Sequence, residues 1–80
     1  MLGYIKIYSV NDVSILVDSA KRSPCRVTIH HNQRIIDGCS LMGVLSIGLV
    51  GKAEIRANGD EADINRFFAD IKNLVVSVQG

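Results

Sequence analysis

The chain has few of the residues that define several common classes of protein. It has two tyrosines, two phenylalanines, no tryptophan and one proline among 80 residues. Its two cysteines, Cys25 and Cys39, are too few for a disulfide scaffold and predict free thiols in a reducing cytoplasm. The longest apolar run, residues 41–50, is well short of the roughly 18 residues that span a bilayer, so we expect no membrane association.

The chain also lacks any cluster of charge of one sign. Its nine lysines and arginines and its eight acidic residues are interleaved, and the formal net charge is +1. A nucleic-acid-binding domain normally needs a basic stripe, and none of the aromatic residues here lies in a basic stretch. The first residues lack the charged segment and long apolar core of a signal peptide. We therefore expect protein partners, no nucleic acid, no membrane, and one domain over residues 1–80.

Apolar residues recur at every second position in three segments, which is typical of half-buried strands. The predicted inward-facing sets are Ile5/Ile7, Cys25/Val27/Ile29 and Ala53/Ile55/Ala57. Residues 34–37 are predicted to return as the hairpin partner of the second strand, after a turn at His31-Asn32-Gln33. The polar residues between the inward-facing positions are expected to face water.

Two segments have the periodicity of helices. The first is ended by Pro24 and capped by either Ser9 or Asn11. The second begins with acidic residues in its first turn, as the helix dipole favours. The apolar positions of the first are Val10, Val13, Leu16, Val17 and Ala20, and those of the second are Ile64, Phe67, Phe68, Ile71 and Leu74. For residues 75–80 the sequence leaves fraying, helix extension and strand pairing open.

These elements predict the order β-α-β-β-α-β-α. A sheet that is wet on one side is mostly antiparallel and carries all its helices on the other side. The expected fold is therefore an α+β open-faced sandwich, with a four-stranded antiparallel sheet and three helices on one face.

The remaining helix, the second along the chain, is predicted in its most informative segment, Ser40-Leu41-Met42-Gly43-Val44-Leu45-Ser46-Ile47-Gly48-Leu49. It is apolar, opened by a serine and interrupted by glycines, which suits a short helix with one buried face. The segment closely resembles the regulatory-serine segment of the HPr family, the small phosphocarrier of the bacterial sugar phosphotransferase system. The order and spacing of the other elements resemble that family over nearly the whole chain.

The resemblance fails where the family carries its phosphocarrier histidine. Counting back from Ser40, that position is Ser9, the family's arginine position is Asn11, and its proline position is Asp12. A hydroxyl would form a stable phosphate ester instead of a high-energy phosphoramidate, so the resemblance implies a member without carrier activity and without a catalytic residue. It is similar to catabolite repression HPr-like proteins, which are not enzymes and need no cofactor. A third hypothesis, less favoured than a regulatory protein or an unmodified interaction domain, is a carrier in which another residue accepts the phosphate.

The two histidines do not replace the missing one. His30 and His31 are adjacent, so on a strand they point to opposite faces, and we expect one to face solvent and the other to lie in the turn. Together with Cys25 and Cys39 they lack the close paired spacing of zinc ligands, so no metal site is expected. Cys39 itself is predicted to be either a buried structural thiol or a reactive one near a helix start.

The resemblance implies that Ser40 is phosphorylated by HPr serine kinase and that the product binds a catabolite control transcription regulator. By the same resemblance, Leu41, Met42 and Leu45 form an exposed patch around Ser40, and Val44 and Ile47 point inward. Serine is also among the best helix caps without any modification. The alternative is an unmodified interaction or assembly domain in which Ser40 only caps its helix.

Overall fold

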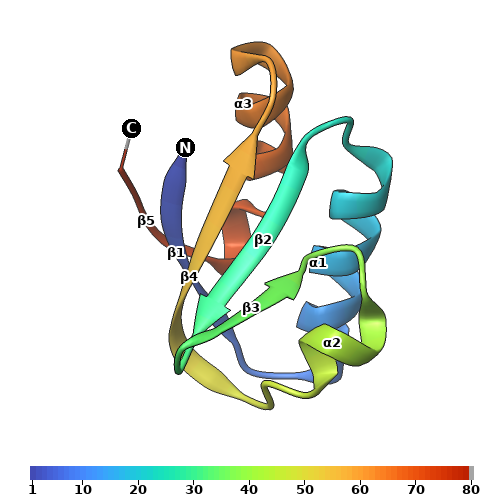
Figure 1. The fold of residues 1–80 in the computed structure, drawn as a ribbon, viewed down its shortest axis with the longest axis vertical. Coiled ribbons are helices and arrows are strands. Elements are labelled where there is room, and N and C mark those ends of the chain that lie inside the picture. Colours follow the sequence, from blue (N-terminus) through green and yellow to red (C-terminus); the bar gives the residue numbers. More distant parts are fainter. Residues whose placement is uncertain (80) are drawn as a thin grey trace.

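The structure, a computed structural model, describes residues 1–79. Five strands form one antiparallel sheet in the order β3-β2-β4-β1-β5 (Figure 1). They are β1 (Leu2–Ile7), β2 (Arg26–His31), β3 (Arg34–Asp37), β4 (Val50–Asn58) and β5 (Val75–Gln79). The long strand β4 lies at the centre, where it pairs with β1 on one side and with β2 on the other.

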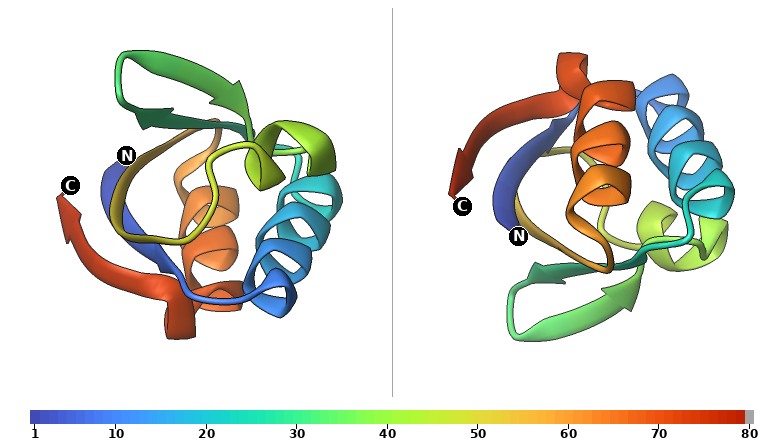
Figure 2. Two further views of the ribbon diagram at one scale, coloured as in Figure 1. Left: turned by 90° about the horizontal axis from the view of Figure 1, so that it is seen from below. Right: turned by 90° about the horizontal axis from the view of Figure 1, so that it is seen from above.

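Three helices cover one face of this sheet and leave the other open (Figure 2). They are α1 (Val10–Arg22), α2 (Leu41–Leu45) and α3 (Glu61–Asp70). The strands alternate buried and more exposed side chains, and the buried positions pack against the helices. All three predicted inward-facing sets of the strands are buried. The expected open-faced α+β sandwich is therefore confirmed.

Helix α1 agrees with its prediction except at its first residue. The Ser9 side chain, not that of Asn11, caps the helix, and the backbone turns extended at Ser23 before Pro24. Val10 is exposed although it was counted on the apolar side, and Ser19 is buried in addition to the predicted set. Val10 is the first residue of the helix, ahead of the turns that contact the sheet, so its exposure leaves the core intact.

The hairpin between β2 and β3 has a shorter turn than expected. His31 pairs with Arg34, so only Asn32 and Gln33 form the loop. Both have positive φ, 50° and 65°, which is the backbone of a type I′ turn. His31 therefore belongs to β2 and not to the turn, because a two-residue loop of this type matches the twist of the strands.

The C-terminal segment departs most from the prediction. Helix α3 ends at Asp70, and a 3₁₀ turn, Lys72–Leu74, follows. Ile71 and Leu74 are buried as expected, but they lie beyond the helix. The valine-rich segment after them pairs with β1 as β5, so the sheet has five strands and not four. Valine favours strands, and the free edge of β1 offers the backbone partners that a frayed end would lack.

Candidate functional site

Ser40 lies at the start of α2 and caps it. Its backbone is extended, with φ −94° and ψ 107°, and its hydroxyl oxygen accepts a hydrogen bond from the Gly43 backbone N–H at 3.1 Å. Its carbonyl oxygen accepts the first helical bond, from the Val44 N–H at 2.9 Å. Ser40 is an exposed residue although its side chain is bonded to the helix.

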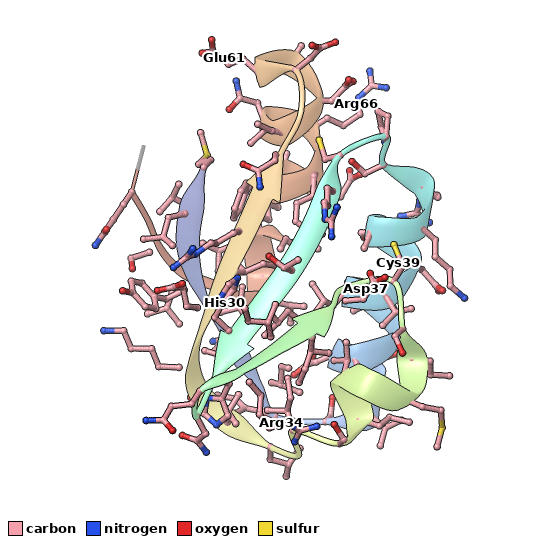
Figure 3. The ribbon with its side chains drawn as sticks, viewed as in Figure 1. His30, Arg34, Asp37, Cys39, Glu61 and Arg66 are labelled. Carbon is pink, nitrogen blue, oxygen red and sulfur yellow. The ribbon has the colours of Figure 1, made fainter. Side chains whose placement is uncertain are left out.

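The loop that leads into α2 is fixed by Asp37, the last residue of β3. The Asp37 carboxylate accepts from the Cys39 N–H at 2.9 Å, and its carbonyl oxygen accepts from the Ser40 N–H at 3.0 Å. Asp37 and Cys39 accordingly lie together beside the start of α2 (Figure 3). Asp37 thus accepts hydrogen bonds from two backbone N–H groups, those of Cys39 and Ser40, that would otherwise be unpaired before α2.

Gly43 allows α2 to lie close to β3 and to its own cap. A Cβ atom at this position would lie 3.0 Å from Ile36 Cγ2 and 3.0 Å from the Ser40 hydroxyl oxygen. Any larger residue would therefore push the cap or the underlying strand aside. Gly48, with φ +80°, then turns the chain out of this segment toward β4.

Exposed apolar side chains follow Ser40 along α2 and the segment after it. Val44 is fully buried and Ile47 packs partly against the core, as predicted. The outward side chains are 44%, 76%, 38% and 69% exposed at Leu41, Met42, Leu45 and Leu49, respectively. We call these four residues, with Ser40, the α2 patch. Leu49 was missed because it follows the helix, although it closes the apolar segment from which the patch was predicted.

The charges near Ser40 are few and of both signs. Helix α2 has no acidic residue in its first turn. Burial raises the pKa of the half-buried Cys39 thiol, the Asp37 carboxylate raises it further, and Lys21 on α1 acts in the opposite direction. A thiol with a raised pKa stays protonated at neutral pH, which favours the inert over the reactive interpretation of Cys39.

Ser9, at the position that the resemblance predicts for the carrier histidine, is held by a different set of contacts. Its hydroxyl oxygen accepts from the Asp12 N–H at 3.2 Å, and the Asp12 carboxylate accepts from the Tyr8 N–H at 2.8 Å. This reciprocal arrangement is close to a capping box. In a capping box the carboxylate would accept from the backbone N–H of the cap residue, Ser9, whereas here it accepts from that of Tyr8, one residue earlier. Asp12 thereby places a negative charge in the first turn of α1.

Neither histidine lies at the start of α1. Both are in β2, where the His30 ring and the Thr28 hydroxyl are 3.0 Å apart. Within residues 1–79, no three His, Cys, Asp or Glu side chains gather as metal ligands. The structure thus brings Ser40 together with Leu41, Met42 and Leu45 at α2, and it places a second serine cap, Ser9, at the start of α1.

These features define a class: a small open-faced α+β sandwich with serine-capped helix starts beside the sheet. A family model described as "PTS HPr component phosphorylation site" matches residues 11–77, most of the chain. The chain therefore belongs to the HPr family of the phosphotransferase system. Proteins of this family are phosphocarriers and not enzymes, and they interact with other proteins of that system.

Two solved structures share the fold. HPr-C-His from Thermoanaerobacter tengcongensis is 18% identical, with a TM-score of 0.72 over 91% of this chain and 92% of that chain. The histidine-containing phosphocarrier protein from Mycoplasma is 21% identical, with a TM-score of 0.72 over 91% of this chain and 89% of that chain. No match was found among the curated proteins compared with the sequence. Among the elements of residues 1–79, no helix has the length and apolar content to cross a membrane.

Proposed function

We propose that this chain is a regulatory member of the phosphotransferase system that does not carry phosphate on histidine and acts through Ser40 and the α2 patch. The observation that carries the proposal is an exposed serine at a helix start that is followed directly by exposed leucine and methionine side chains. The proposed modifying enzyme is an HPr serine kinase, and the proposed partner is a catabolite control transcription regulator. Both act in the cytoplasm, where we propose that this chain acts.

The residues at the start of α1 support the absence of carrier chemistry. A carrier needs an imidazole whose phosphoramidate passes its phosphoryl group on. Here the side chain at that position is the Ser9 hydroxyl, which is engaged with the Asp12 N–H. A phosphate on it would be a stable ester next to the Asp12 carboxylate, so it would neither form readily nor transfer.

Phosphorylation of Ser40 has a simpler physical outcome. The hydroxyl oxygen displaces ADP from the γ-phosphorus of ATP and loses its proton. The product adds about −1.5 to −2 charges at a helix N-terminus, where free N–H groups and the dipole favour an anion. No acid of the first turn opposes it, although the Asp37 carboxylate near the cap does. The α2 patch would then combine apolar side chains with a new negative charge, a surface suited to a specific protein partner.

The alternative, an unmodified interaction domain, is favoured by one observation. The cap hydrogen bond and the exposed patch are both complete without a phosphate. In that case Ser40 contributes only to helix stability, and the partner recognises Leu41, Met42 and Leu45 directly.

Intact mass spectrometry separates the two. The protein is incubated with ATP and an HPr serine kinase that is shown to be active on its own substrate, and two variants, Ser40→Ala and Ser9→Ala, are treated alike. We expect one added phosphate on the wild type and on Ser9→Ala, and none on Ser40→Ala. No phosphate on the wild type would remove the switch and leave the unmodified domain. Phosphate on Ser40→Ala would place the modification elsewhere.

A further inference from the structure

The open face of the sheet differs in charge from the helix side. Four cations and one carboxylate of β1, β2 and β4 point away from the helices: Lys6, Arg26, Lys52, Arg56 and Glu54. Helices α1 and α3, with the Asp60 cap and the 3₁₀ turn, carry four cations and six carboxylates. The formal charge is therefore +3 on the open face and −2 on the helix side, in a chain whose net charge is +1. The His30 ring also lies on the open face (Figure 3).

The cations of the open face are mostly without an acidic partner. Arg56 Nε and Glu54 Oε2 are 2.7 Å apart, and this is the one ion pair found in residues 1–79. Glu54 lies at the centre of the face, opposite Tyr4 on β1 and His30 on β2. Arg26 and Lys52 are exposed and lie outside that pair. Their positive charges are therefore available to a ligand.

Two lysines also lie close to each other across neighbouring strands. Ile5 pairs with Ala53 and Ile7 with Val50, so Lys6 faces residues 51–52 of β4. Like charges at facing positions destabilise a sheet. Each ammonium group lies over a tyrosine ring instead of an acid: Lys52 Nζ is 4.6 Å from the Tyr4 centroid, and Lys6 Nζ is 5.4 Å from the Tyr8 centroid. This arrangement orders the cations without neutralising them.

We propose that the open face, on which the exposed cations Arg26 and Lys52 lie on either side of Glu54, is a docking surface for an acidic segment of a partner protein. The face and such a segment are complementary in charge: exposed cations without acidic partners attract carboxylates, and an arginine fork binds them in a bidentate manner. The proposal is independent of Ser40, because it concerns the face opposite the helices.

An acidic protein segment fits this face better than a nucleic acid does. Tyrosines that bind single strands present free rings to the bases, whereas the Tyr4 ring is covered by the Lys52 ammonium group. The Glu54 carboxylate in the middle of the face would repel a continuous row of phosphates. The mixed charge of a protein surface can match a central acid surrounded by cations.

The test is fluorescence anisotropy with a fluorescein-labelled peptide of glutamates that carries one lysine at its centre, to match the central acid of the face. We expect binding at about 10 mM ionic strength, where charges act over roughly 30 Å, and a marked loss at about 150 mM, where they are screened beyond roughly 8 Å. In Arg26→Gln/Lys52→Gln the dissociation constant should rise about tenfold or more, which is the effect of losing about 1.4 kcal/mol of binding free energy. Circular dichroism and thermal unfolding establish that the variant is folded.

The matched control is Lys21→Gln/Lys72→Gln, which removes the same charge from the helix side. It should bind the peptide as the wild type does, and so should Ser40→Ala. An equal loss of peptide affinity in the Lys21/Lys72 control would mean that only the net charge of the protein matters, and it would overturn the proposal. Absence of peptide binding at low ionic strength would do the same, as would tighter binding of a labelled single-stranded oligonucleotide that depends on Arg26 and Lys52. If the double variant does not fold, Lys52→Gln alone is measured, with Lys72→Gln as its control.

Discussion

The two helix starts that carry serine caps differ in almost everything except the cap. The hydroxyl oxygens of Ser9 and Ser40 each accept a hydrogen bond from the backbone N–H three residues later in the chain, at 3.2 and 3.1 Å, respectively. At α1 that residue is Asp12, whose carboxylate reaches back to the preceding loop. At α2 it is Gly43, which brings no charge and allows the helix to lie close to β3. The same cap thus closes one helix start with a negative charge and leaves the other without one.

The two helices also differ in how firmly the core holds them. Helix α1 has 13 residues and five of them are buried, whereas α2 has five residues and only Val44 is buried. A helix as short as α2 has little stability of its own. Helix α1 therefore serves as a structural element, whereas α2 presents side chains to solvent, and substitutions in α2 should destabilise the fold less.

The largest expected effect is on the anchors of the two helices. Leu16→Ala, at a fully buried position of α1, should lower the free energy of unfolding by about 2–5 kcal/mol. Val44→Ala removes two buried carbon atoms from α2 and should cost about 2 kcal/mol. Urea denaturation followed by circular dichroism measures both. Leucine loses one carbon atom more than valine in these substitutions, so an equal loss per carbon atom removed would contradict the view that α2 is the more weakly held helix.

A smaller effect is expected at the caps themselves. Ser9→Ala removes the cap of the longer helix and half of a reciprocal arrangement, so it should cost about 1–2 kcal/mol. Ser40→Ala should cost about 0.5–1 kcal/mol, because fewer residues depend on α2. Threonine at each position keeps a hydroxyl cap and serves as the control. A larger loss at Ser40 than at Ser9 would reverse the comparison.

Much of this architecture could be predicted from periodicity. Alternation fixed the buried face of each central strand, and the spacing of Val13, Leu16 and Val17 fixed the buried side of α1. The α2 segment could be predicted because its serine, glycines and leucines occupy positions with distinct physical demands. These signals are local, and the structure confirms them for that reason.

What could not be predicted depends on contacts between distant segments. The Val75–Gln79 segment becomes a strand because β1 has a free edge, a fact that its own sequence does not contain. The loop of the hairpin excludes His31 because pairing of His31 with Arg34 decides where the turn begins. The role of Asp37 in fixing the start of α2 also depends on the fold, since its carboxylate and its carbonyl bond to different residues.

A negative charge placed on each cap provides a further test of the difference between the starts of α1 and α2. Aspartate is as good a cap as serine, and an anion is favoured at a helix N-terminus. Ser40→Asp should therefore leave the free energy of unfolding within about 0.5 kcal/mol of the wild type. Ser9→Asp places its carboxylate beside Asp12 and should lose about 0.5 kcal/mol or more, with the loss reduced at high salt. Urea denaturation at two salt concentrations distinguishes these outcomes, and Ser9→Asn and Ser40→Asn are the uncharged controls.

The smallest expected effect concerns Cys39, which reports the electrostatic potential beside Ser40. Burial and the Asp37 carboxylate hold the pKa of the thiol above its ordinary value of 9.0. A raised folded-state pKa stabilises the fold below the ordinary value, and this contribution is lost as the pH rises through the folded value. We expect the stability advantage of the wild type over Cys39→Ser to shrink above about pH 9.

The same thiol offers a probe of Asp37. Asp37→Asn keeps a side-chain oxygen for the Cys39 N–H but removes the negative charge, so the pKa of Cys39 should fall and its alkylation by iodoacetamide at about pH 8 should become faster. Asp18→Asn, on α1, is the control for removing a carboxylate elsewhere. An unchanged rate would mean that Asp37 contributes little potential at the cap. In that case the carboxylate would not oppose a phosphate on Ser40 either, and α2 would accept negative charge even more readily than its comparison with α1 implies.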